Sequence, residues 1–291
     1  MGPPPERRCD QSNMRILVIG CGYVGLPLAQ TLARMGHQVH GTRRSEFSAA
    51  DVTPHALDVT DPSSFEAIPK DFDVIYYTPS SSRGDASVHQ AVFVDGTTHL
   101  LNWLEDTATR LIFTSSTSVY PQTDGNWVDE TANHDGATGT AINLLQAETL
   151  FQESPQLATI LRVAGIYGPE RGYLYRQFLK DEAVITQGGS RWINMIHRDD
   201  VVSALVTALN IPPGIYNASD DEPLTQRAFF EWLARELDKT VPPEGEVQKR
   251  KRAVTNKRVS NAKLKATDWQ LKYPNFREGY GALINEEQGG H

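Results

Sequence analysis

A glycine-rich hexapeptide near the start of the chain, GCGYVG at residues 20–25, has the spacing of a phosphate-binding loop. It follows a short apolar run at residues 14–20, which is typical of a buried strand, and it precedes a segment from Leu26 with helical spacing of apolar residues. A glycine-rich turn between a strand and a helix predicts a site for the pyrophosphate of a dinucleotide. The alternative is a turn with a structural role only.

Each glycine of this loop has a separate expected role. Gly20 allows the tight turn, Gly22 lets the backbone approach the phosphates, and Gly25 lets the helix pack against the strand. The N-terminus of the helix offers free N–H groups and the positive end of its dipole. Tyr23 and Val24 belong to the same loop, so we expect them to contact the cofactor as well.

The next predicted strand ends in HGTRR, which places Arg43 and Arg44 where NAD-binding sites usually carry an acidic residue. A guanidinium there would pair with a 2′-phosphate, so the sequence favours NADP over NAD; a pair of surface arginines is the alternative. Asp58, in the segment ALDVTD, is expected either to contact the adenine or ribose or to cap its own loop. Thr78, at the end of the following strand, completes the expected cofactor contacts.

The motifs lie on a regular alternation of predicted strands and helices. The strands are expected at 14–20, 38–44, 73–78, 110–116 and 158–168, with helices from 26 and at 91–108 and 142–152. This order indicates an α/β fold, a doubly wound parallel sheet of the Rossmann type with a small C-terminal substrate lobe. We expect a disordered leader at 1–13, the dinucleotide-binding domain at 14–168, and at 169–291 a mixed region with the small lobe and returning Rossmann elements.

Composition limits the classes of partner. Lys and Arg number 28 against 36 Asp and Glu, for a formal charge of -8, which argues against nucleic acid or an anionic membrane as the main partner. The exception is a basic run at 248–258, expected to be a solvated surface segment or else a contact to an anionic substrate. Two cysteines, Cys9 and Cys21, cannot form a disulfide framework. We predict no metal site, no membrane span and a cytoplasmic location.

Further motifs follow in a recognisable order: VDGTTHLL, TSSTSVY, LRVAGIYGPERG, INMIHRDDVVSALVTAL, GIYNASDDEPLT and KRVSNAKL. With the phosphate loop, they cover most of the chain. The chain resembles the short-chain dehydrogenase/reductase superfamily in its extended NAD(P)-dependent epimerase/dehydratase form. The FTSSTSVY segment and the absence of a Tyr-x-x-x-Lys motif are more similar to the atypical, YeeZ-like branch of that family than to the sugar-nucleotide epimerases.

The resemblance implies a set of catalytic positions. Ser116 occupies the place of the serine that hydrogen-bonds the reacting oxygen, and Asp95 stands where extended members carry Asn. The family's Tyr-x-x-x-Lys pair is missing: Thr140 and Leu144 fall at its two positions. No Tyr occurs from 121 to 166 and no Lys from 71 to 179.

Losing the tyrosine removes the usual proton donor. We therefore expect the proton to come from Tyr120, from Tyr167 or from ordered water; the alternatives are a packing or substrate-contact role for Tyr120 and a structural role for Tyr167. Arginines of the expected lobe suit an anionic substrate; they are Arg171, Arg176, Arg191 and Arg198.

The favoured function is an NADP-preferring oxidoreductase or epimerase-like enzyme acting on a small anionic or sugar-like molecule. One alternative is a non-catalytic dinucleotide-binding sensor or partner protein, and another is a nucleotide-sugar epimerase. The resemblance also implies a homodimer through the helices near 95–105 and 140–151.

Overall fold

The computed structural model describes residues 13–81, 86–105, 107–246 and 255–289. The predictions for the leader up to residue 12, for Cys9 and for residues 248–254 of the basic run lie outside these ranges. Within them, seven parallel strands form one sheet in the order β11-β7-β5-β4-β1-β2-β3. Their bounds are β1 Arg15–Ile19, β2 Gln38–Arg43, β3 Val52–Ala56, β4 Val74–Tyr77, β5 Arg110–Ser116, β7 Ala158–Val163 and β11 Gly214–Ala218.

The strand order reverses between β1 and β4. Chain progression runs from β1 outward to β2 and β3 on one side, and from β4 outward to β5, β7 and β11 on the other. In open α/β sheets a ligand binds at the carboxyl ends of the strands beside such a reversal. The expected doubly wound Rossmann sheet is confirmed, and the GCGYVG loop follows β1 at the reversal.

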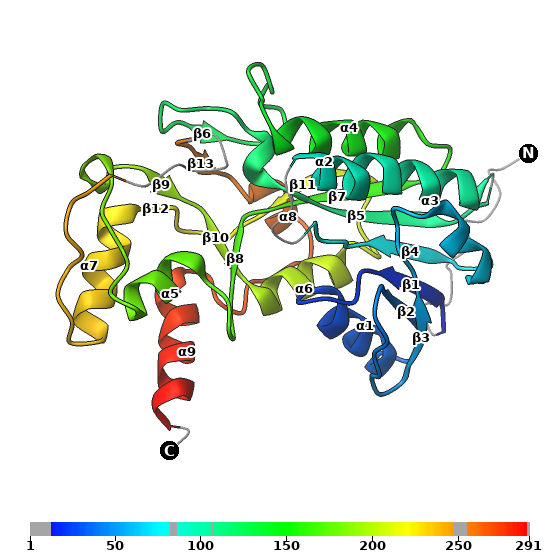
Figure 1. Cartoon of the computed structure of the whole chain (residues 1–291), viewed down its shortest axis with the longest axis horizontal. Helices are drawn as coiled ribbons and strands as arrows, with labels where there is room; N and C mark the ends of the chain where they lie inside the picture. The colour runs from blue at the N-terminus through cyan, green and yellow to red at the C-terminus, as the bar shows by residue number, and fades with distance from the viewer. Residues whose placement is uncertain (1–12, 82–85, 106, 247–254, 290–291) are drawn as a thin grey trace, which may run out of the picture.

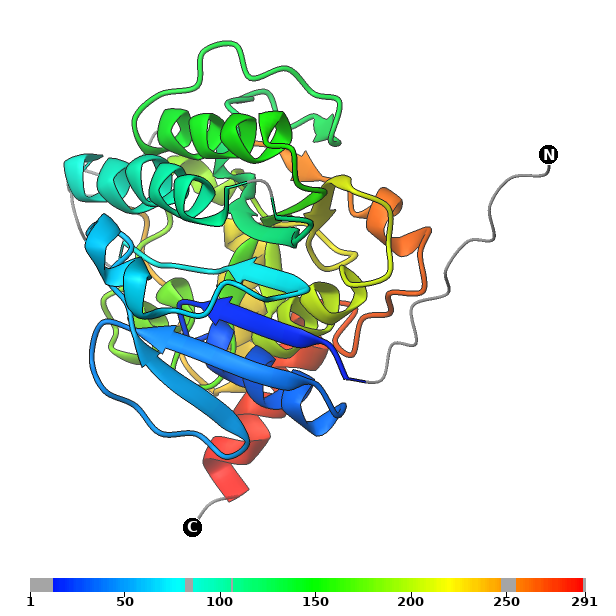
Figure 2. The ribbon, with the colours of Figure 1, turned by 90° about the vertical axis from the view of Figure 1, so that its right-hand side faces the viewer.

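Helices cover both faces of the sheet (Figures 1 and 2). Helices α1 (Gly25–Arg34) and α6 (Arg198–Thr207) pack on one face, and α3 (Gly96–Leu104) and α4 (Thr140–Glu153) pack on the other. Successive residues of a strand point to opposite faces, so both sets must be apolar. In β1, Ile16 and Val18 enter the core beneath α1, while Leu17 and Ile19 enter the core beneath α3 and α4.

The predicted helix at 91–108 starts earlier and ends earlier than expected. Its axis begins with α2 (Ala86–Gln90), passes through a π-helical turn η2 (Ala91–Asp95) and continues as α3. It stops at Glu105, which adopts a positive φ of 53°.

The predicted strand at 158–168 is two strands, so that prediction was wrong. β7 ends at Val163, the Ala164 N–H donates to the carbonyl of Ala218, and β8 (Gly165–Tyr167) then pairs with β10 (Met195–His197) in a separate sheet. The chain leaves the central sheet here, which carries Tyr167 into the smaller part of the molecule.

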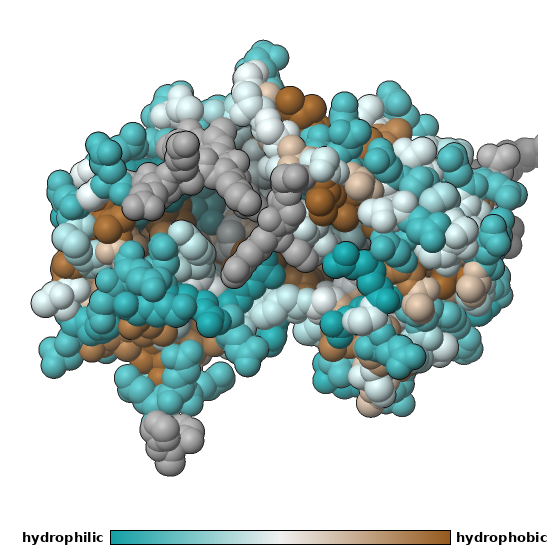
Figure 3. All heavy atoms as spheres, in the orientation of Figure 1, coloured by the Kyte–Doolittle hydropathy of each residue, from teal (hydrophilic) through white to brown (hydrophobic). Residues whose placement is uncertain are grey.

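That smaller part, here called the lobe, has its own core of aromatic and aliphatic side chains. It is built from α5 (Tyr173–Leu179), α7 (Gln226–Glu236), α9 (Phe276–Gly289), β9 (Trp192–Ile193) and β12 (Leu224–Thr225). Figure 3 shows the surface indented between the lobe and the part that carries α1 and β1 to β3. The remaining short elements are η1 Pro62–Ala67, η3 Thr117–Val119, β6 Trp127–Val128, η4 Gln187–Gly189, β13 Arg258–Val259 and α8 Ala262–Lys265.

Candidate functional site

The turn after β1 is built for close backbone approach. Gly20 has a φ of 96°, and a Cβ there would lie 2.6 Å from the carbonyl oxygen of Thr78. A Cβ on Gly25 would lie 2.2 Å from the carbonyl oxygen of Gly20. Gly22 differs, since a Cβ there would meet nothing closer than 4.0 Å. The outer glycines therefore allow loop and helix to pack, while Gly22 leaves an open approach for a ligand.

In the first turn of α1, the Leu26 N–H donates to the carbonyl of Gly22 at 3.1 Å, and Pro27 has no N–H. Val24 occupies the N-cap position and no side chain caps this helix. A helix N-terminus without a side-chain cap leaves N–H groups available to phosphate oxygens. Thr78, at the end of β4, donates from Oγ1 to the carbonyls of Ile19 and Gly20 at 3.0 and 3.2 Å, so it holds β4 against the loop.

Tyr23 joins the phosphate loop to the chain that enters the lobe. Its hydroxyl donates to the carbonyl of Pro169 at 2.9 Å. The guanidinium carbons of Arg171 and Arg198 lie 4.9 and 5.3 Å from its ring centre. Two of the arginines expected to serve an anionic substrate therefore lie beside the cofactor loop.

The end of β2 carries the expected pair of cations. Arg43 and Arg44 are exposed, and neither pairs with a carboxylate among the described residues. The Arg43 guanidinium lies 5.9 Å from the ring centre of Phe47. Asp58 uses one oxygen to accept from the N–H and hydroxyl of Thr60 at 3.0 and 2.8 Å, so it caps its own loop.

Ser116 lies at the carboxyl end of β5, partly exposed. Its Oγ caps the short turn η3 by accepting the N–H of Ser118 at 3.2 Å. That bond uses an acceptor position and leaves the hydroxyl proton available to a second partner. The structure thus places the Ser116 hydroxyl at the carboxyl end of β5, while its catalytic role stays a prediction.

The helix that should carry the Tyr/Lys pair offers no substitute at these positions. Thr140 is the first residue of α4, and Leu144, at the lysine position, is 3% exposed and packs in the core beneath α3 and α4. Asp95 is exposed on the opposite helix. An apolar side chain in the core can neither bond a ribose nor lower a neighbouring pKa.

Tyr120 lies in the interior, which argues against the predicted role as proton donor. It is 0% exposed, its hydroxyl donates to Oδ1 of Asn217 at 2.7 Å, and that hydroxyl accepts from Nη1 of Arg162 at 3.0 Å. Burial raises its pKa, against the opposing effect of the Arg162 charge. Both hydrogen-bonding directions of this hydroxyl are already used.

Tyr167 also lies in the interior, because β8 carries it into the core of the lobe, which argues against a role as proton donor. It is 1% exposed and its ring stacks on Tyr280 at a centroid distance of 4.2 Å. Its hydroxyl, whose pKa is raised by burial, meets the backbone of α9 so closely that a Cβ on Gly279 would overlap it. Of the three predicted catalytic side chains, only Ser116 is partly exposed.

Two features were missed by sequence reasoning. Arg162 and Glu148 form a buried ion pair beneath Tyr120, and the Ser115 hydroxyl donates to the same carboxylate at 2.6 Å. Lys257, in the basic run expected at the surface, is 5% exposed and bonds the chain just after Ser116. The KRVSNAKL motif contained this lysine, but its polar composition gave no sign of burial.

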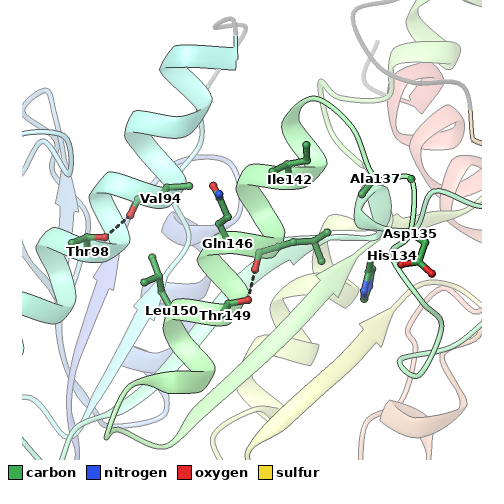
Figure 4. Close-up of a pocket in the computed structure, with 11 residues that line it drawn as sticks. Val94, Thr98, His134, Asp135, Ala137, Ile142, Gln146, Thr149 and Leu150 are labelled. Carbon is green, nitrogen blue, oxygen red and sulfur yellow. Dashed lines mark hydrogen bonds between the residues drawn. The ribbon is translucent and has the colours of Figure 1, made fainter.

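A groove of about 730 Å³ lies on the outer side of α3 and α4 (Figure 4). Val94 and Thr98 line it from one side, and Ile142 and Gln146 line it from α4. It lies on the helical layer and not at the carboxyl ends of the strands, so it is distinct from the dinucleotide loop. Within the described parts of the chain, no three metal-ligating side chains cluster and no helix is long and apolar enough to cross a membrane.

The sheet order, the glycine loop at the strand reversal and the uncapped helix define a Rossmann-type protein with a dinucleotide loop. The chain belongs to the NAD dependent epimerase/dehydratase family, whose sequence profile matches residues 16–219.

Similar proteins agree with this assignment. The chain is 30% identical to Protein YeeZ of Escherichia coli (strain K12) over 241 residues, which cover 77% of this chain and 84% of YeeZ. A Methylobacillus flagellatus structure, provisionally classed as an NAD-dependent epimerase/dehydratase, is 31% identical with a TM-score of 0.78, covering 94% and 99% of the two chains.

A more distant structure shares the fold. The UDP-glucuronic acid 4-epimerase of Bacillus cereus, in complex with UDP-glucuronic acid and NAD, has a TM-score of 0.77 at 19% identity, with 96% and 100% of the chains covered.

Proposed function

We propose that this protein is an oxidoreductase or epimerase-like enzyme that binds NADP in preference to NAD and acts on a small anionic or sugar-like substrate. The observation that carries the cofactor preference is the end of β2. Arg43 and Arg44 are exposed there without a carboxylate partner among the described residues, where an NAD site would place an acid. The open backbone at Gly22 and the N-terminus of α1, which no side chain caps, support the pyrophosphate position.

In this proposal, Ser116 polarises the reacting oxygen. The bound cofactor would supply or accept hydride at the substrate carbon, while the Ser116 hydroxyl hydrogen-bonds the oxygen on which charge develops. Since the hydroxyls of Tyr120 and Tyr167 lie in the interior, water at the Ser116 turn is the proposed proton source. A water molecule is a weaker acid than the family's tyrosine, whose pKa the neighbouring lysine lowers. Proton transfer would therefore be slow, or the substrate would need little help from a proton donor.

Two other functions compete with this one. A nucleotide-sugar epimerase gains support from the Bacillus cereus neighbour, whose ligands are UDP-glucuronic acid and NAD. A non-catalytic sensor gains support from Thr140 and Leu144 at the positions of the missing pair. The partly exposed Ser116 at the end of β5 favours an enzyme, because a sensor has no need of a hydroxyl there.

The serine provides the test. Hydride transfer would be followed as loss of NADPH absorbance with a panel of keto acids, and as gain of NADPH absorbance from NADP with a panel of sugar nucleotides. We expect Ser116→Ala to lower turnover by about 10²–10³, as when a single oxyanion donor is removed. Ser118→Ala, two residues further on the same turn, is the matched control. Equal turnover by the wild type and Ser116→Ala would refute the proposed role, and no turnover with any substrate would favour the sensor.

We also propose that a second copy of the chain covers the groove on the outer side of α3 and α4, as the family resemblance implies. Ile142, on the groove, is 44% exposed. Val94, Leu145 and Leu150 line the same groove, and contiguous apolar surface of this kind marks an interaction site. Light scattering should give twice the mass of the chain, and Ile142→Lys should give a monomer; a wild-type monomer at micromolar concentration would contradict this proposal.

A further inference from the structure

The side chain of Tyr23 extends from the GCGYVG loop to the chain that enters the lobe. Its backbone lies between Gly22, which a ligand can approach, and Val24, the N-cap residue of α1. Its side chain is half-buried, and its hydroxyl donates to the carbonyl oxygen of Pro169, 146 residues further along the chain, at 2.9 Å. One residue therefore belongs to the proposed phosphate site and contacts a segment far away in the sequence.

That segment is a tight turn at residues 168–171, here called the entry turn. The Gly168 N–H donates to the carbonyl of Arg171 at 3.2 Å, and the Arg171 N–H donates to the carbonyl of Gly168 at 3.0 Å. Glu170, inside the turn, adopts a positive φ of 61°. The entry turn connects β8 to α5 of the lobe (Figure 1). Because two hydrogen bonds join its ends, we expect it to move as a unit.

Tyr23 packs closely against the entry turn. A Cβ on Gly168 would lie only 2.7 Å from the Tyr23 hydroxyl oxygen. The guanidinium carbon of Arg171, in the turn, lies 4.9 Å from the ring centre of Tyr23, and that of Arg198, the first residue of α6, lies 5.3 Å from it. A cation over an aromatic ring is attracted to it. Both the hydroxyl and the ring therefore hold Tyr23 to the entry turn.

The core of the lobe holds the entry turn at both of its ends. Tyr167 precedes the turn, and its ring stacks on Tyr280 of α9 at a centroid distance of 4.2 Å. Gly172 follows the turn, and a Cβ there would lie 2.8 Å from the hydroxyl oxygen of the same Tyr280. Packing this close transmits a displacement from one element to the next. A shift of the entry turn would therefore reach α9.

We propose that Tyr23 is a positioning residue that couples the GCGYVG loop to the lobe. When a dinucleotide fixes the loop, the Tyr23 side chain fixes the entry turn and, through it, the lobe. The inference rests on the proposed function, since it needs a dinucleotide bound at this loop. By linkage, ordering of the turn and binding of the dinucleotide favour each other by the same factor.

Hydrogen exchange of the full chain, with and without saturating NADPH, measures this coupling. In the wild type, peptides covering 168–179 should exchange at least about fivefold more slowly with NADPH, the lower end of the usual range of coupling factors. Tyr23→Phe keeps the ring and removes the hydroxyl, so this slowing should fall below about twofold as one hydrogen bond is lost. Peptides covering 20–34 should be slowed by NADPH in both proteins, which shows that the loop is occupied.

Tyr216→Phe is the matched control. The Tyr216 hydroxyl also donates to a proline carbonyl, that of Pro212, at 2.9 Å. This residue lies on β11, which β7, β5 and β4 separate from β1, so the variant should keep the wild-type slowing. A contact with a packing role only would make 168–179 of Tyr23→Phe exchange faster in both states and leave the effect of NADPH unchanged. That result would overturn the inference.

Gly168→Ala tests the contact from the side of the turn. The added methyl would lie 2.7 Å from the Tyr23 hydroxyl oxygen, at a strained φ of 151°. The strain is the same with Tyr or Phe at position 23, whereas the clash requires the hydroxyl. Gly168→Ala should therefore lower the Tm less in Tyr23→Phe than in the wild type, and equal losses would contradict the inference.

The wild type separates this inference from the proposed function. If it binds NADPH and the exchange of 168–179 does not slow, the coupling is refuted while the proposed cofactor stands. If it binds neither NADPH nor NADH, the proposed function is refuted and the coupling with it.

Discussion

The guanidinium of Arg162 and the carboxylate of Glu148 form a buried ion pair, with 2.6 Å between Nη2 and Oε2 and with each side chain 2% exposed. The pair joins β7 to α4 directly beneath Tyr120. The arginine also donates from Nη1 to the Tyr120 hydroxyl at 3.0 Å. The interior beneath the α4 positions where the family's Tyr/Lys pair is missing is therefore held by an ion pair and its hydrogen bonds.

Breaking the pair should be strongly destabilising. We expect Glu148→Gln to lower the free energy of unfolding by about 3–5 kcal/mol, because Arg162 would keep a buried charge without its counter-ion. Urea unfolding measures the change. Glu153→Gln, at an exposed position near the end of the same helix, is the control and should stay within about 0.5 kcal/mol of the wild type. A loss below about 1 kcal/mol for Glu148→Gln would contradict the account of this pair.

Tyr120→Phe separates a structural hydroxyl from a catalytic one. Removing the hydroxyl leaves Asn217 without its donor and Arg162 without one acceptor, which should cost about 1–3 kcal/mol of stability. Turnover, measured below the unfolding transition, should change little. Tyr173→Phe, 72% exposed, serves as the control. A loss of about 10²–10⁴ in turnover would instead show that Tyr120 is the proton donor.

Gly25→Ala tests the loop geometry. The added methyl would lie 2.2 Å from the carbonyl oxygen of Gly20 and 2.8 Å from Oγ1 of Thr78, and the backbone of Gly20 cannot shift easily. We expect an overpacking cost of about 1–3 kcal/mol and a large loss of NADPH affinity. In Gly281→Ala the methyl meets nothing within 4 Å, so this control should match or exceed the stability of the wild type. Unchanged NADPH affinity in Gly25→Ala would show that the nucleotide does not use this loop.

The fold was predictable where one physical signal dominated. Ile16 to Ile19 are all apolar, so the strand that they form must be buried on both faces. The glycines at 20 and 25 indicate a tight turn directly after it. Strand, loop and helix therefore follow from the local sequence. The end of β7 was not predictable, because the apolar run continues from Val163 into Gly165. Only the pairing of Ala164 with β11, distant in sequence, shows where the strand leaves the sheet.

The site was less predictable than the fold. Ser116 lies at a strand end, which sequence order already implies. Tyr120 and Tyr167 lie near strand ends too, but their burial depends on Asn217 and on Tyr280, both far away in the chain. Lys257 was missed for the same reason: its contact with Tyr120 spans 137 residues, while its neighbours in sequence are polar and basic.

Cofactor choice is the central claim, and a fluorescence titration of the purified protein with NADPH and with NADH tests it most directly. We expect saturable binding of NADPH with at least about a tenfold margin over NADH, from one charge-assisted contact of about 1.5–3 kcal/mol to the 2′-phosphate. Arg43→Ala and Arg44→Ala should reduce that margin, while Arg34→Ala, exposed at the end of α1, should not. Equal affinity for the two nucleotides would contradict the role of the arginines, and binding of neither would contradict the proposed function.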